Sequence, residues 1–424
     1  MANTQEIKVK KGGITYHIIP TEKFKTNTFI FKFKAPLRKE DATKRALLAN
    51  VLQSGTQQYP SRAKMRAYLD DLYGASFSID LQKKGEYHII SISMEIANEQ
   101  FLSVPEPLLD KAFTFLHEVI FRPLVKDRTF HPEIVKREKE TLKQRIQALY
   151  DDKMRYANMR LIEEMCKDEP YSIPVNGILE DVDPITPENL YTYYEQVLNE
   201  DEIDLYIIGD LDPEGVVRRC DETFSFAERT PKHTEHERTF DRKEERVVVE
   251  KQEVAQGKLN IGYRTNIRYG DDDYFALQMF NGLFGGFPHS KLFINVREKA
   301  SLAYYATSRL ESHKGLILVM TGIETKNYER ALAIIREQLQ AMQKGDFTDK
   351  EIEQTKAVIH NQMLETLDTS RGLTEVLYHN VISKKNVTEE MWIDGINNVT
   401  KEDIVRVANK IVPDTVYFLS GMEA

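Results

Sequence analysis

Apolar residues recur along the chain with two spacings, in some segments at every second position and in others at every third or fourth. Alternating or short continuous apolar runs predict strands, which we expect at 28–33, 87–96, 204–208, 316–323 and 416–419. The helical spacing predicts helices at 108–121, 133–150, 187–197 and 328–342. Strands and helices are therefore mixed along the whole chain.

The order of these predicted elements repeats once, at a spacing of roughly 210 to 230 residues. Thr186 caps a helix that leads into a strand, and Thr400 does the same in the second half. The repeat predicts an α+β fold of two duplicated domains, each a mixed sheet with helices mainly on one face. We expect these parts at 1–227, 228–246 (a charged linker) and 247–424.

Composition restricts the classes of partner and compartment. The formal net charge of -9 and the pI near 5.7 argue against nucleic acid or an anionic membrane as the main partner. No apolar run reaches the roughly 18 residues of a membrane span, and the first residues lack the apolar centre of a secretion signal. Cys166 and Cys220 fit a reducing compartment and have no metal-ligand spacing. We therefore expect a cytoplasmic protein.

The segment 281–305 combines a glycine-rich turn with an arginine and a tyrosine. Gly285 and Gly286 separate two apolar helical patterns, which predicts two helices hinged at glycine. Arg297 closes the second helix, and Tyr304 lies seven positions later in the next predicted strand. The turn, which includes Phe287, is either ordinary helix-helix packing or a substrate-contacting loop, and the residues leave both interpretations open.

The run Ser290 to Tyr304, SKLFINVREKASLAY, resembles the second-domain signature of the pitrilysin/insulinase-like (inverzincin) metallopeptidases. The resemblance covers nearly the whole chain, although Ser301 stands where that family usually has glycine. It implies half of a clamshell around a chamber in which an extended peptide adds to a sheet edge. It also implies that Arg297 and Tyr304 contact the substrate carbonyl opposite the zinc, and that the glycine-rich turn with Phe287 binds substrate.

The zinc motif of the active relatives is missing. In that family H-x-x-E-H, shortly before a Gly-Thr pair, places two zinc ligands one helical turn apart and adds a Glu that acts as base. Counting back from the pair at 55–56 puts these positions at Ala46, Ala49 and Asn50. The third ligand position, a Glu on a later helix, is occupied by Arg145, which cannot lose its proton to bind zinc. We therefore expect neither a metal nor another cofactor in this chain.

These residues lead to the hypothesis of a non-catalytic subunit in a heterodimeric zinc peptidase. A zinc-binding paralogous subunit would hold the metal and the base, while Arg297 and Tyr304 donate hydrogen bonds to the scissile carbonyl of a peptide. One alternative is a stand-alone peptide-binding or scaffolding protein, such as a homodimer, that has merely inherited the two residues. Another is an active peptidase with relocated ligands. In a fourth, Arg297 is a surface residue and Tyr304 a core aromatic.

Overall fold

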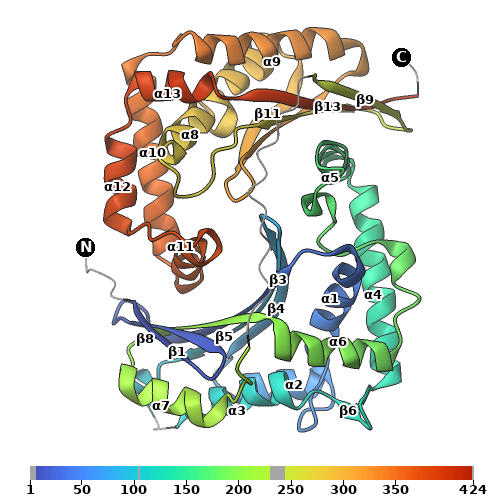
Figure 1. The fold of residues 1–424 in the computed structure, drawn as a ribbon, viewed down its shortest axis with the longest axis vertical. Helices are drawn as coiled ribbons and strands as arrows, with labels where there is room; N and C mark the ends of the chain where they lie inside the picture. The colour runs from blue at the N-terminus through green and yellow to red at the C-terminus, as the bar shows by residue number, and fades with distance from the viewer. Residues whose placement is uncertain (1–5, 104–105, 230–243, 423–424) are drawn as a thin grey trace. The chain divides into compact units, whose positions relative to one another are not determined.

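The computed structural model describes residues 6–103, 106–229 and 244–422. The chain forms two compact units (Figure 1), one from 1–148 and 173–235 and the other from 149–172 and 236–424. The first unit is therefore not the continuous 1–227 expected from the repeat, because 149–172 groups with the second half. Most of the expected linker lies outside the described residues. No helix in the described ranges has the length and apolarity needed to cross a membrane.

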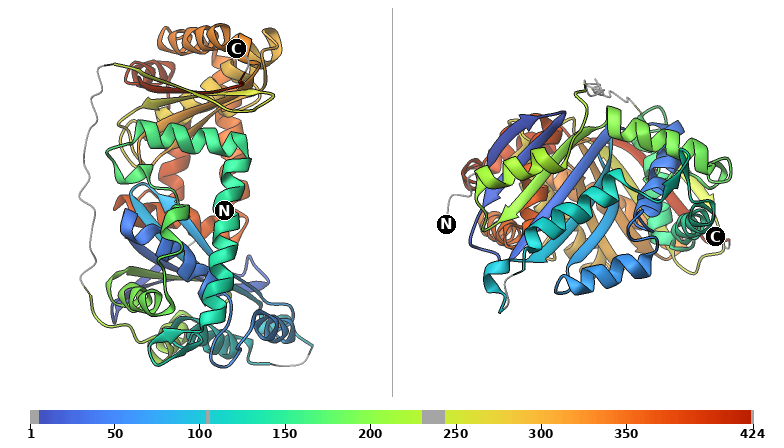
Figure 2. Two further views of the ribbon diagram at one scale, coloured as in Figure 1. Left: turned by 90° about the vertical axis from the view of Figure 1, so that its right-hand side faces the viewer. Right: turned by 90° about the horizontal axis from the view of Figure 1, so that it is seen from below.

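The first unit is built on a mixed sheet, six-stranded in the described residues, with the order β1-β2-β8-β3-β5-β4. Helices cover one face of this sheet, as Figure 2 (right) shows. The sheet strands are β1 (Ile7–Lys11), β2 (Ile14–Pro20), β3 (Thr26–Pro36), β4 (Ser76–Lys84), β5 (Tyr87–Ala97) and β8 (Glu202–Gly209). The remaining elements are α1 (Lys39–Leu52), α2 (Arg62–Asp71), η1 (Glu99–Phe101), α3 (Leu108–Phe121), β6 (Val125–Lys126), β7 (Thr129–Phe130), α4 (Pro132–Asp151), η3 (Leu179–Asp181), α6 (Pro187–Glu200) and α7 (Pro213–Thr223).

The second unit has a five-stranded sheet in its described part, with the order β11-β12-β10-β13-β9. Its strands are β9 (Arg246–Lys251), β10 (Gly257–Arg264), β11 (Ala303–Glu311), β12 (Leu316–Ile323) and β13 (Val412–Ser420). Its helices are α5 (Lys153–Met165), η2 (Pro170–Ser172), α8 (Tyr274–Asn281), η4 (Gly282–Gly286), η5 (Phe293–Lys299), η6 (Thr325–Asn327), α9 (Tyr328–Gln343), α10 (Asp349–Leu367), α11 (Ser370–Ser383), α12 (Glu389–Asn397) and α13 (Lys401–Ala408). The predicted strands and helices are present, most of them slightly longer than predicted.

Alternation along the second sheet explains why 149–172 belongs to this unit. On β12, Ile317 and Val319 belong to the main core, which includes residues of α9, whereas Leu316 and Leu318 face the opposite side and belong to a second apolar cluster with residues of α5. Figure 2 (left) shows α5 on that opposite face. The second sheet is therefore covered by helices on both faces, with α5 as the cover contributed by the first half of the sequence.

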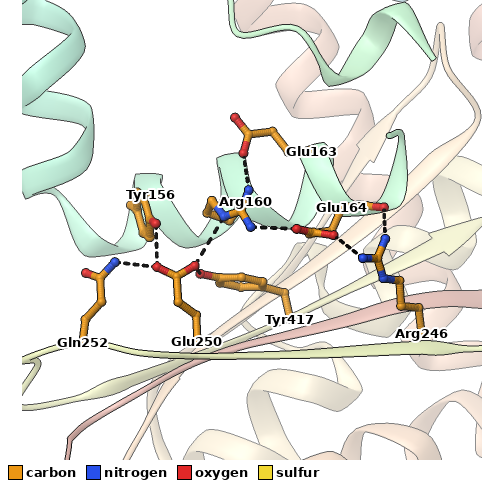
Figure 3. Close-up of polar contacts among 8 residues, drawn as sticks. All are labelled: Tyr156, Arg160, Glu163, Glu164, Arg246, Glu250, Gln252 and Tyr417. Atoms are coloured by element: carbon orange, nitrogen blue, oxygen red, sulfur yellow. Dashed lines mark hydrogen bonds and ion pairs between the residues drawn. The ribbon is translucent and has the colours of Figure 1, made fainter. Parts of the chain in front are cut away.

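Polar contacts fix α5 to the sheet (Figure 3). The carboxylate of Glu250 on β9 accepts hydrogen bonds from the hydroxyls of Tyr156, at 2.6 Å, and Tyr417, at 2.7 Å. Arg246 forms an ion pair with Glu164 at 2.7 Å. These bonds join α5 to the two neighbouring strands β9 and β13, so the apolar contact has a defined position and register.

Candidate functional site

The helix α1 carries the positions at which active relatives have their zinc motif. Every residue from Arg45 to Leu52 is buried, so the helix is enclosed on all sides by the core. Ala46 is 2% exposed and Ala49 4% exposed, and both pack in the apolar core of the first unit. Asn50 is also buried, and among the described residues its amide nitrogen has no hydrogen-bond partner.

A buried arginine next to these positions fixes α1 in place. The guanidinium of Arg45 donates to the carbonyl of Phe33 at 2.6 Å and to the carboxylate of Asp201 at 2.5 Å. It also lies 3.3 Å from the hydroxyl of Tyr193. Because a buried charge is tolerated only when it is paired and hydrogen-bonded, this network determines the orientation of α1.

A buried carboxylate on α4 lies close to the end of α1 but does not offer a metal ligand. Glu138 is fully buried and accepts hydrogen bonds from Ser54 at 2.9 Å, from Arg62 at 2.8 Å and from Arg137 at 2.9 Å. The sequence contains a signal for this burial, since Glu138 lies midway between the apolar residues Ile134 and Leu142 at a spacing of four. That spacing does not show which residues its carboxylate binds.

The residues at the family's zinc positions do not fit a zinc ion. Ala46 and Ala49 have no ligating atom, Asn50 offers only a neutral amide oxygen where the family has an imidazole, and Arg145 is an exposed cation on α4. In the described part of the chain no group of three or more His, Cys, Asp and Glu residues is arranged to hold a metal.

The second unit presents the glycine-rich turn. α8 continues into the π-helix η4 rather than breaking at a glycine hinge, and a second π-helix, η5, carries Arg297. Such wide turns are frequent at functional sites. At Gly285 a Cβ atom would lie 2.8 Å from the backbone nitrogen of Ser308, which explains the glycine. The hydroxyl of Thr307 donates to the Gly285 carbonyl at 3.0 Å, so the turn is fixed to β11.

Arg297 and Tyr304 are both displayed at the surface. The guanidinium of Arg297 lies 4.5 Å from the ring centroid of Phe293, and no ion pair to Arg297 is found in the described residues. Tyr304 is 83% exposed, so the interpretation of this side chain as a core aromatic is wrong. Tyr304 lies in a β-bulge between Ala303 and Ala306 on the edge strand β11, and bulges redirect side chains.

The backbone between these two residues is strained. Ser301 adopts a φ of 52°, in the left-handed region that favours glycine. Its hydroxyl donates to the carbonyl of Glu298 at 3.2 Å, and the neighbouring Leu302 nitrogen donates to the Val296 carbonyl at 3.1 Å. These bonds hold the tight connection from η5 to β11 despite the missing glycine.

A cavity of about 400 Å³ lies beside the turn, within the second unit. Gly286 and Phe287, two of the three predicted substrate-binding residues, line this cavity, while Gly285 does not. The other walls come from α8, β11, α10, α11 and α12. This cavity could not be predicted from the sequence, because its walls are far apart along the chain.

Comparison with known proteins determines the family. A family model described as "Peptidase M16 inactive domain" matches residues 184–359. A Bacillus subtilis (strain 168) protein named "Probable inactive metalloprotease YmfF" is 54% identical, over 100% of this chain and 99% of its own length. The chain belongs to the peptidase M16 family. This M16 chain resembles inactive metalloproteases. The family predicted from the signature around Arg297 and Tyr304 is therefore confirmed.

Solved structures agree with the M16 assignment. A crystal structure of a conserved protein from Enterococcus faecalis V583 has a TM-score of 0.93 and 37% identity, over 99% of both chains. A peptidase M16 inactive domain from Pseudomonas fluorescens shares the fold, with a TM-score of 0.80 at 16% identity. The predicted mixed α/β fold in two domains is therefore confirmed.

Proposed function

We propose that this M16 chain is the non-catalytic subunit of a heterodimeric zinc peptidase that binds extended peptides. The observation that carries the proposal is a contrast in exposure between the zinc-motif positions and the residues Arg297 and Tyr304. Ala46, Ala49 and Asn50 are buried without a ligand set, whereas Arg297 and Tyr304 are exposed and available to a molecule outside the chain. Two buried cysteines and the acidic composition favour a cytoplasmic setting for this function.

The chemistry assigned to this chain is hydrogen-bond donation. During attack on a peptide bond the carbonyl oxygen gains negative charge, and donors already aimed at that oxygen stabilise the transition state. The guanidinium of Arg297 and the hydroxyl of Tyr304 are suitable donors. The partner subunit would hold the zinc and the glutamate that activates water.

The comparisons support the existence of a suitable partner. Bacillus subtilis (strain 168), which has the inactive relative, also has proteins named "Uncharacterized zinc protease YmxG" and "Uncharacterized zinc protease YmfH". These are 22% identical to this chain over 291 residues and 32% identical over 99 residues, respectively. Inactive and zinc-protease members of one family thus occur in a single organism, as a heterodimer requires.

Peptide hydrolysis by mixed subunits tests the proposal. This chain is combined with a zinc-protease relative from the same cell, and a quenched-fluorescence peptide library is assayed with each chain alone and with the mixture. We expect cleavage only in the mixture, and a loss of on the order of 10²-fold with Arg297→Ala. Arg330→Ala, an exposed arginine on α9, is the matched control.

Three outcomes would count against the proposal. Cleavage by this chain alone, together with bound zinc, would indicate relocated ligands. Peptide binding without cleavage in any mixture would support a stand-alone binding protein. Equal activity of the mixtures with Arg297→Ala and Arg330→Ala would show that Arg297 does not act at the active site of the partner subunit.

A further inference from the structure

The cavity beside the glycine-rich turn has the size and composition of a side-chain pocket. Its volume of about 400 Å³ lies in the range of small-ligand sites. Aromatic rings make up much of its wall, and the turn predicted to bind substrate forms part of the rim. The aromatic lining residues are Tyr269, Tyr274, Phe287 and Trp392.

Four polar side chains of the wall are bonded to one another in two pairs. The amide of Gln278 donates to the hydroxyl of Tyr274 at 2.6 Å, and the amide oxygen of Asn281 accepts from the hydroxyl of Ser308 at 2.8 Å. Because these groups already have partners, a polar ligand gains little from them. The wall therefore favours a ligand that fills space and stacks on aromatic rings.

A histidine pair forms the stacked side of the pocket. The ring of His379 lies parallel to Tyr269, with centroids 5.0 Å apart and an interplanar angle of 19°. A ring nitrogen of His379 is 2.6 Å from one of His313, which fixes the orientation of the imidazole. The wall thus presents ordered aromatic faces rather than mobile side chains.

The charge of the lining excludes a basic ligand. Arg309 is the charged residue among those that line the cavity, and its guanidinium binds the carboxylate of Glu311 at 2.7 Å. No carboxylate lines the cavity in the described part of the chain. A lysine or arginine side chain would find no opposite charge there to offset the cost of removing its charge from water. A neutral aromatic ring has no charge to desolvate.

We propose that this cavity binds an aromatic side chain of the peptide substrate, an inference that rests on the proposed function. The wall residue Ser308 lies four positions after Tyr304 on β11. Because of the bulge, the five steps from Ala303 to Ser308 face only four steps on β12, so at about 3.3 Å per step the pocket and the carbonyl-contacting tyrosine are about 10 to 13 Å apart along the strand. An extended peptide covers this distance in about four residues, so the anchor residue lies about four positions from the scissile bond.

Intrinsic fluorescence tests the pocket without any partner subunit. The single tryptophan of the chain, Trp392, lines the cavity and reports directly on its occupancy. The probes are the blocked pentapeptide Ac-Ala-Ala-Phe-Ala-Ala-NH2 and the same peptide with alanine in place of phenylalanine. We expect a saturable change in Trp392 emission with the first peptide and none with the second.

Two substitutions on one helix give the matched comparison. Val376 of α11 lines the cavity, so Val376→Phe should fill it and weaken binding by at least about tenfold, roughly 1.4 kcal/mol. Arg371→Phe places the same ring at an exposed position of α11 outside the lining and should leave binding unchanged. If Val376→Phe does not fold, as judged by circular dichroism, Phe287→Ala replaces it and should weaken binding by removing part of the wall.

The results separate this inference from the proposed function. The assignment of the cavity to an aromatic side chain would be wrong if both peptides gave equal changes in emission. It would also be wrong if the folded pocket variant bound the phenylalanine peptide as tightly as the parent chain, even if the mixed subunits hydrolyse peptides. In an active mixture, cleavage sites mapped by mass spectrometry should carry an aromatic residue about four positions from the cut. Val376→Phe should abolish that preference, and cleavage sites without it in the unmodified mixture would contradict the assignment.

Discussion

The two segments that would carry the chemistry of an M16 peptidase differ in how they are used. α1 in the first unit is enclosed by apolar side chains and fixed by the buried Arg45. The segment from η5 to β11 in the second unit is exposed at Arg297 and Tyr304 and strained at Ser301. The helix that carries the zinc-motif positions of active relatives is thus packed as ordinary core, whereas the segment from η5 to β11 keeps exposed and strained features that stability alone does not require.

Replacement of the buried Arg45 on α1 should have the largest effect on the stability of the protein. Arg45→Met leaves the carboxylate of Asp201 buried without its cation, so we expect the free energy of unfolding to fall by about 3–5 kcal/mol. Urea denaturation measures this change. Lys44→Met, one position away and partly exposed, is the control and should be nearly neutral. A loss below about 1 kcal/mol would show that α1 is not held as core.

A second buried polar site in the first unit should show a pH dependence. His17 is buried between the carboxylates of Asp204, at 2.9 Å, and Glu6, at 2.6 Å. Burial acts to lower the pKa of His17, but the hydrogen bonds and charges of both carboxylates outweigh it and leave the pKa raised. The stabilisation by protonated His17 is therefore complete below its unfolded pKa of about 6.5 and disappears as the pH rises through the higher folded value.

Replacement of this histidine makes the dependence measurable. His17→Phe keeps a ring beside Tyr206 and should lower the free energy of unfolding by about 1.5–3 kcal/mol near pH 6, where Asp204 and Glu6 are ionised and His17 is protonated, and by less as the pH rises further. Thermal or urea unfolding at a series of pH values measures the difference from the parent chain. The exposed His131→Phe is the control. Above about pH 6, a difference that is constant with pH, or that grows as the pH rises, would contradict the assignment.

The smallest expected effect lies in the second unit. Ser301→Gly loses the hydrogen bond to Glu298 but adopts a φ of 52° without the steric cost to a side chain, so its free energy of unfolding should exceed that of Ser301→Ala by about 1 kcal/mol. Ser301→Ala keeps the Cβ atom and loses the hydrogen bond to Glu298, so it should be destabilising. Differential scanning calorimetry compares the two variants. Equal stability of both would show that the connection is not strained.

Much of the fold followed from local patterns. The predicted helix 108–121 coincides with α3, and the predicted strand 316–323 coincides with β12. In both segments the apolar residues follow a clear pattern that is typical of that type of element. The membership of α5 did not follow. An amphipathic stripe shows that a helix packs on something, but it does not identify the sheet that receives it, and here that sheet is formed by the second half of the chain.

The candidate site also has a part that could be predicted from the sequence and a part that could not. The signature around Arg297 and Tyr304 is contiguous in sequence and could therefore be recognised, together with the departure at Ser301. The pocket could not be predicted, since its walls come from separate helices and from β11 and meet only in the folded unit. The burial of Glu138 agrees with its position between the apolar residues Ile134 and Leu142, but one of its two cationic partners, Arg62, is distant along the chain.

The most direct test of the central claim is the split between kcat and KM for Arg297→Ala in the mixture with a zinc-protease relative. Loss of a donor that acts on the developing oxyanion lowers kcat and kcat/KM together, so we expect a kcat lower by about 100-fold or more with KM little changed. An unchanged kcat with a raised KM would show that Arg297 only binds the ground state, and no change in either would show that it has no part in the reaction.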